Sequence, residues 1–87
     1  MKEITFNGLT FEYDEKALRR YDVQKYIATA TENLSNAYKV IEIIFAGRDL
    51  EYAQMLDNDD AAMGELLKAA VQDATEGNDA DARAVKN

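Results

Sequence analysis

The spacing of apolar residues changes along the chain from a period of two to a helical period. Residues 2–13 alternate between apolar and polar, and the pair Asn7 and Gly8 divides them into two runs. This pair favours a two-residue hairpin turn because both residues tolerate positive φ. Such a turn places Phe6 opposite Leu9 and puts the apolar residues of the hairpin on one face. That face consists of Ile4, Phe6, Leu9, Phe11 and Tyr13.

Beyond the hairpin, apolar residues recur at three- and four-residue intervals, which predicts four helices. Their expected bounds are 22–32, 35–46, 49–57 and 60–75. Asp22, Ser35 and Asp49 suit the N-cap positions of the first three, since their side chains accept hydrogen bonds from free backbone N–H groups. The polar run 57–60 ends the third helix and supplies the cap of the fourth. Residues 14–21 form a connection of about one helical turn.

The segment 35–46 is the most apolar part of the chain, and the other elements are expected to pack around it. Its apolar residues follow helical spacing, and Gly47 suits the left-handed residue that closes a helix. Several of them are β-branched and would also suit a buried strand. The shortness of the run and the cap signals favour a helix. Its inward-facing residues are Ala37, Val40, Ile41, Ile44 and Phe45.

A few more residues are expected to face the interior because they continue these apolar stripes. Tyr21 lies in the connection before the first helix, and Leu34 extends the stripe of that helix. Leu50 leads the stripe of the third helix. In the fourth helix, Gly64 costs up to about 1 kcal/mol relative to alanine, and we interpret it as the mark of a close helix contact.

The chain is expected to form one small α+β domain, mainly α, in which the N-terminal hairpin packs on a bundle of about four helices. The domain spans residues 1–76, and the small, charged residues 77–87 form a disordered tail. A chain of this length buries only about 60 to 65 per cent of its unfolded surface. Its own core is therefore small, and additional stability from a partner or from self-association is expected.

The composition lacks the residues on which most catalytic sites depend. With no His and no Cys, the chain has neither a Ser–His pair nor a thiolate metal site. Its glycines are scattered, so no phosphate-binding loop is visible. The run 57–60 resembles the start of a calcium loop, but Ala62 and Lys68 stand where that loop needs a glycine and a bidentate acid. We expect no enzyme activity, no metal ion and no cofactor.

The net charge of −7 argues against nucleic-acid binding, which depends on clustered Lys and Arg. The stretch 49–65 contains several acidic residues and no basic residue. It is interpreted as a solvated face or as a surface that attracts a basic partner. The N-terminus has neither a long apolar run nor a signal-peptide cleavage site, so no membrane segment is expected and the cytoplasm is the expected location.

Five residues are candidates for a partner-binding surface, because aromatic side chains and Met are favoured at the centres of protein interfaces. They are Tyr38, Phe45, Tyr52, Met55 and Met63. The same residues would also fill a core, with the tyrosine hydroxyls reaching water. Spacing alone leaves both interpretations open.

The segment ITFNGLTFEYD, from Ile4 to Asp14, leads into an acidic helical body and a charged tail. This order of features over residues 1–76 resembles the small tail assembly chaperones of long-tailed bacteriophages and prophages. The resemblance implies a non-enzymatic cytoplasmic protein that coats the tape measure protein during tail assembly and helps recruit tail tube subunits. It also implies that a longer form can arise by translational frameshifting near residues 78–87.

Two hypotheses for the function follow. In the first, a chaperone shields apolar, helical segments of a client; its partners are tape measure and tail tube proteins, and it self-associates. In the second, a small acidic inhibitor or adaptor binds a basic, nucleic-acid-binding protein by presenting carboxylates in place of phosphates. The first predicts binding that persists in high salt, whereas the second predicts a one-to-one complex that weakens steeply with salt.

Overall fold

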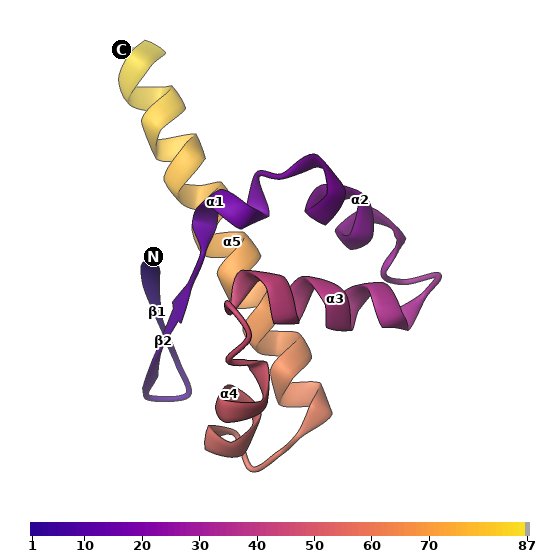
Figure 1. Cartoon of the computed structure of the whole chain (residues 1–87). Helices are drawn as coiled ribbons and strands as arrows, with labels where there is room; N and C mark the ends of the chain where they lie inside the picture. Colours follow the sequence, from indigo (N-terminus) through magenta and orange to yellow (C-terminus); the bar gives the residue numbers. More distant parts are fainter. Residues whose placement is uncertain (87) are drawn as a thin grey trace.

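The structure is a computed structural model of the chain, which describes residues 1–76 in full and residues 77–86 through the backbone of the last helix. The predicted disordered tail, 77–87, therefore lies outside the fully described residues and stays a prediction. The architecture of the described part is an N-terminal hairpin followed by helices, shown in Figure 1. The predicted α+β class is confirmed.

The hairpin consists of strands β1 (Lys2–Phe6) and β2 (Leu9–Tyr13), which pair antiparallel. Phe6 lies opposite Leu9, and the turn residues Asn7 and Gly8 have φ values of 52° and 76°. The predicted register is therefore confirmed, and so is the predicted face. Ile4, Phe11 and Tyr13 on that face are buried, while Phe6 and Leu9 pack at its margin.

Five helices follow the hairpin, one more than the four predicted with explicit bounds. They are α1 (Glu15–Leu18), α2 (Tyr21–Thr29), α3 (Leu34–Ile44), α4 (Asp49–Met55) and α5 (Asp60–Lys86). The extra helix, α1, is the single turn expected in the connection. Asp14 begins it, because the Asp14 carboxylate accepts hydrogen bonds from the backbone N–H groups of Lys16 and Ala17.

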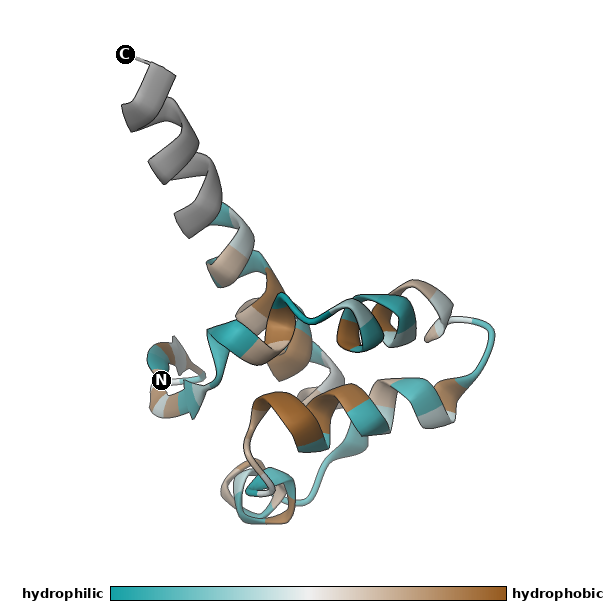
Figure 2. Cartoon of the chain, turned by 45° about the horizontal axis from the view of Figure 1, so that its top comes forward, coloured by the Kyte–Doolittle hydropathy of each residue, from teal (hydrophilic) through white to brown (hydrophobic). Residues whose placement is uncertain are grey.

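The helices are arranged around the crossing of α3 and α5. In Figure 1, α2 and α3 lie side by side and extend together to one side, while α5 crosses α3. The hairpin lies beside α5, and α4 lies beside its first turns. The hydrophobic parts of α3 and of the middle of α5 come together near this crossing (Figure 2). The largest fully buried side chains are Phe11, Tyr13, Val23, Val40, Ile44, Phe45 and Leu66.

Three predicted N-caps are wrong by one or two residues, although α4 begins at Asp49 as predicted. Asn33, not Ser35, caps α3: its backbone is extended and its side chain accepts from the N–H of Ser35, which is already helical. Asp22 and Asp49 lie within the first turns of α2 and α4 instead of at their caps. In these positions their negative charges still stabilise the helix, because they lie near the positive end of its dipole. In contrast, the expected cap from the run 57–60 is present, since Asp59 accepts from the N–H of Ala61.

Three residues predicted to face the interior are exposed. Tyr21 is 82% exposed, Leu34 is 69% exposed and Leu50 is 75% exposed. Each stands at the first or second position of its helix, at the end of the helix and away from the turns that pack on the core. In α4 the buried positions are instead Tyr52 and, just beyond its end, Leu56, which are four residues apart and share a face.

Candidate protein-binding groove

The five predicted contact residues do not form one surface. Phe45, Tyr52 and Met63 are buried in the core, whereas Tyr38 and Met55 are exposed by 54% and 42%. Phe45 follows the last turn of α3 and lies on the same inner side as its buried residues. Tyr38 and Met55 are therefore the two members of the set that lie on the surface.

Tyr52 holds β2 against α4. Its ring makes edge contacts with Phe11 and Phe45, at centroid distances of 5.0 and 5.3 Å. Its hydroxyl accepts from the backbone N–H of Glu12 at 3.2 Å and lies 3.0 Å from the carbonyl oxygen of Glu12, to which it donates. Because these Glu12 groups face away from β1, Tyr52 satisfies part of the outer edge of the hairpin.

An open groove runs along α5 on the side that faces α3, and we call it the α3–α5 groove. It consists of three adjoining hollows with volumes of about 200, 170 and 350 Å³. The first lies between α3, α4 and the start of α5, the second between α3 and α5, and the third between α2, α3 and α5. Tyr38 and Ile41 border the first two hollows, and Ala37 and Leu67 border the last two. The hollows are therefore adjacent along α5.

Successive turns of α5 form one wall of the groove. Asp60 and Met63 line the first hollow, Gly64 and Leu67 the second, and Leu67 and Val71 the third. These residues recur every three or four positions, so they lie on one face of the helix. From Asp60 to Val71 this face is about 17 Å long at the usual helical rise.

Half of the large exposed apolar side chains in residues 1–76 line this groove. Among the fully described residues, six large hydrophobic residues are exposed, and three of them line the groove: Leu34, Tyr38 and Leu50. The first two come from α3 and the third from α4. Met55, the other exposed member of the predicted set, is not among the lining residues. A cluster of this kind marks a candidate interaction site more strongly than single exposed residues do.

The two ends of the groove differ in charge. The carboxylates of Asp49, Asp59 and Asp60 line the first hollow, whereas Lys68 lines the third. The Tyr38 hydroxyl donates to Asp60 Oδ1 at 2.7 Å, and this bond raises the pKa of Tyr38. Lys68 also pairs with Glu65 at 3.5 Å. The groove is therefore apolar in its middle and acidic at one end, and the other end carries one lysine with a carboxylate beside it.

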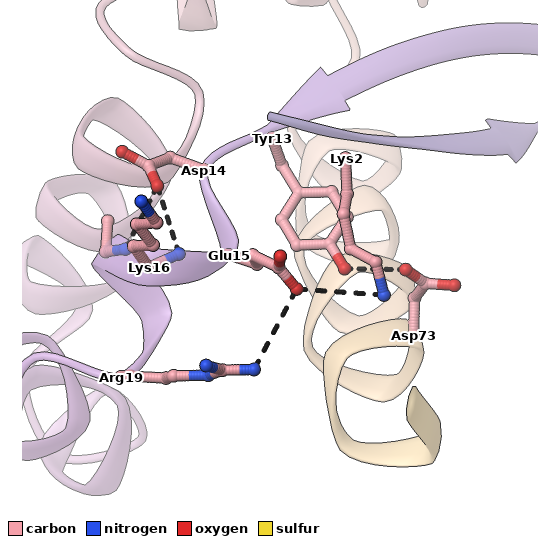
Figure 3. A network of polar contacts seen from close by, with 8 residues as sticks. Lys2, Tyr13, Asp14, Glu15, Lys16, Arg19 and Asp73 are labelled. Atoms are coloured by element: carbon pink, nitrogen blue, oxygen red, sulfur yellow. Dashed lines mark hydrogen bonds and ion pairs between the residues drawn. The ribbon is translucent and has the colours of Figure 1, made fainter. Parts of the chain in front are cut away.

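A second polar cluster lies away from the groove and ties the hairpin to α1 and α5 (Figure 3). The Tyr13 hydroxyl donates to Asp73 Oδ2 at 2.6 Å, and Glu15 pairs with Lys2 at 3.7 Å and with Arg19 at 4.0 Å. Burial, and then the bond to Asp73, raises the pKa of Tyr13. The cluster joins segments 60 residues apart in sequence, so we assign it to the stability of the fold.

Neither a metal-binding cluster nor a membrane-spanning helix is found in the part of the chain that the structure describes. No group of three acidic side chains there is arranged to hold a metal ion. No described helix combines the length and hydrophobicity needed to cross a bilayer. In the run 57–60, Asp57 and Asn58 instead take positive φ values, which turn the chain from α4 into α5.

Comparison with protein-family models, with curated proteins and with solved structures finds no match to this chain. The interpretation of the groove therefore depends on its own geometry and chemistry. Sequence reasoning missed Leu34 and Leu50, which it placed in the interior. Their positions at helix starts are the signal that distinguishes them, because the first turn of a helix commonly projects beyond the core.

Proposed function

We propose that this protein is a non-enzymatic tail assembly chaperone of a long-tailed phage or prophage, active in the cytoplasm of the bacterial host. In this role it shields apolar helical segments of the tape measure protein and helps recruit tail tube subunits. The observation that carries the proposal is the α3–α5 groove, with its three adjoining hollows and the three exposed apolar residues that line it, Leu34, Tyr38 and Leu50.

The mechanism is hydrophobic burial. A client helix that enters the groove removes its own apolar side chains and those of the groove from water, at about 25 cal/mol per Å² of apolar area. This contribution is reversible, so the client leaves when tail subunits make larger contacts with it. The net charge of −7 opposes aggregation of the loaded chaperone.

The experiment that tests the proposal is co-expression of the full chain with the tape measure protein encoded near it in its genome. We expect the tape measure protein to stay soluble and to co-purify with the chain. Leu34→Asp and Leu50→Asp should abolish this effect, because each places a carboxylate in the apolar groove. Tyr21→Asp is the matched control: Tyr21 starts α2 as Leu34 starts α3, and it lies outside the groove.

Two results would contradict the proposal. One is a tape measure protein that aggregates equally with and without the chain. The other is equal activity of Leu34→Asp, Leu50→Asp and the wild type.

The acidic-inhibitor hypothesis keeps a specific observation in its favour, because Asp57, Asp59 and Asp60 are all exposed at the start of α5. Exposed carboxylates at neighbouring positions present the charge that a basic nucleic-acid-binding surface recognises. That function requires a complex that dissociates as salt is raised from 0.1 to 1 M, since salt screens exposed charges. A client complex that persists in 1 M salt would exclude it.

A further inference from the structure

Gly64 lies in the interior of α5, where glycine is less favourable than alanine. The predicted close contact with another helix of the same chain is absent, because a Cβ atom built on Gly64 would meet nothing within 4 Å. Positive φ does not explain the glycine either, since Gly8 and Gly47 are the positive-φ glycines found. Gly64 lines the middle hollow of the groove, between Leu34 and Leu67. The missing side chain therefore opens space toward the groove.

Glycine is commonly used where another backbone must approach closely. In the groove, the approaching backbone belongs to whatever occupies the hollow, since nothing in the described chain does so. The three hollows follow successive turns of α5, which rise about 5.4 Å each. A second helix packed along α5 repeats its apolar side chains at the same interval. The geometry therefore fits a helix with one small residue opposite Gly64.

The charged residues at the ends of the α3–α5 groove indicate which residues the bound helix carries at its own ends. Asp49, Asp59 and Asp60 border the first hollow, and no Lys or Arg side chain lines it. Lys68 borders the third hollow. Charge complementarity favours Lys or Arg at the end of the occupant that reaches the first hollow, and an acidic or neutral residue at the other end.

We infer that the α3–α5 groove binds one amphipathic client helix, with its closest approach at Gly64 and its basic end between Asp49, Asp59 and Asp60. This inference rests on the proposed function, and it specifies the class and the direction of the client segment. The occupant presents apolar residues at positions i, i+4, i+7 and i+11, which is the helix-in-groove mode of recognition.

The first experiment tests the charge requirement by calorimetric titration of the full chain with synthetic helical peptides. The probe peptide has leucines at i, i+4, i+7 and i+11, alanine at its centre, two arginines at one end and two glutamates at the other. The matched peptide replaces both arginines with glutamates. We expect the probe to bind at least tenfold more tightly in low salt, with the difference shrinking in 1 M salt.

The direction of binding is tested with variants at the two ends. The double variant Asp49→Asn, Asp59→Asn should remove most of the preference for the arginine peptide, and asparagine at position 59 still accepts the cap hydrogen bond. Lys68→Gln should leave that preference in place. A nitroxide label at the arginine end should broaden the amide signals of Asp59 and Leu50 in preference to that of Val71.

The second experiment tests Gly64 with Gly64→Ala. The added methyl group favours the helix, so the melting temperature should rise, yet it occupies the open space, so the probe peptide should bind roughly fivefold more weakly. Thr75→Ala is the control, because Thr75 is exposed on α5 outside the groove. It should leave peptide affinity unchanged.

Each outcome decides a separate point. Equal affinity for the two peptides would overturn the charge and direction of the inference, and unchanged binding by Gly64→Ala would overturn the close approach. If neither peptide binds and Leu34→Asp alters only self-association, the occupant is a second copy of the chain and the inference is overturned. None of these results replaces the co-expression experiment, which tests the chaperone function itself.

Discussion

At the scale of single residues, the structure decides which apolar side chains are buried and which are exposed to solvent. Phe45 and Tyr38 both come from the most apolar segment, yet Phe45 is buried and Tyr38 is 54% exposed. Tyr13 and Asp73 form a hydrogen bond across 60 residues of sequence. The burial of Phe45 agrees with its helical spacing in α3. The exposure of Tyr38 and the bond between Tyr13 and Asp73 depend instead on how α5 lies against the rest of the chain.

The bond between Tyr13 and Asp73 makes stability sensitive to high pH. Burial and this bond raise the pKa of Tyr13 in the folded state above its ordinary value of about 10. The folded state then keeps the proton to higher pH than the unfolded state, so its stabilisation is complete below about pH 10 and is lost as the pH rises beyond it. Urea unfolding at pH 9 and pH 11 should show a larger loss for the wild type than for Tyr13→Phe. Equal losses would contradict the assignment.

The cap of α3 gives a second prediction at this scale. Asn33→Ala removes the side chain that accepts from the backbone N–H of Ser35, so the free energy of unfolding should fall by about 1 kcal/mol. Ser35→Ala is the matched control, because it keeps the backbone N–H of Ser35 and removes only an exposed hydroxyl that donates to Asn33 Oδ1 at 2.7 Å. It should change stability by roughly 0.5 kcal/mol or less. A larger effect from Ser35→Ala in chemical denaturation would restore Ser35 as the cap.

At the scale of elements, β2 and α4 are joined by one side chain. Tyr52 packs on Phe11 and Phe45, and its hydroxyl contacts both the N–H and the C=O of Glu12. A two-stranded hairpin is marginal in water without a helix beneath it. Tyr52 therefore helps to keep the hairpin on the helices, a role that sequence reasoning did not assign to it.

Tyr52→Phe should lower the free energy of unfolding by about 1 to 2 kcal/mol, because the two Glu12 hydrogen bonds are lost while the ring contacts remain. Tyr21→Phe serves as the control, since Tyr21 is 82% exposed. Hydrogen exchange adds a more specific readout: the amide of Glu12 should exchange faster in Tyr52→Phe. An unchanged exchange rate would show that the hydroxyl does not hold this strand edge.

At the scale of the whole molecule, a small acidic chain leaves an apolar groove open to water. The α2–α3 pair extends to one side of α5 (Figure 1), and the third hollow of the groove lies between these helices. Filling the groove would require longer side chains at Gly64 or Ala37. Their absence lowers the stability of the free chain and leaves apolar surface for another molecule.

The open groove predicts weak self-association of the free protein. Light scattering over a concentration series should show a mass that rises with concentration in both low and high salt, since apolar contacts are not screened. Leu34→Asp, or an excess of the arginine-ended peptide, should return the protein to the monomer mass, whereas Tyr21→Asp should not. A monomer at every concentration would contradict self-association and favour the acidic-inhibitor hypothesis.

Much of the fold was predictable because its signals are local. The register of the hairpin follows from a two-residue turn and a period of two, and the helical spacing of apolar residues in 60–75 agrees with the burial of Met63, Leu66 and Ala70. The helix starts were less predictable because neighbouring residues such as Asn33 and Ser35 are both good caps, and only the backbone conformation distinguishes them. Of the predicted contact residues, Tyr38 alone lines the groove while remaining exposed.

The sequence by itself determined the hairpin, the positions of the helices and the acidic surface, since these depend on residue type and on spacing over a few positions. Only the tertiary structure decided that Tyr52 belongs to the core, that Leu34 and Leu50 are exposed, and that Gly64 opens into a groove. These outcomes depend on where α5 crosses α3. That crossing is a packing of distant segments, and no local pattern specifies it.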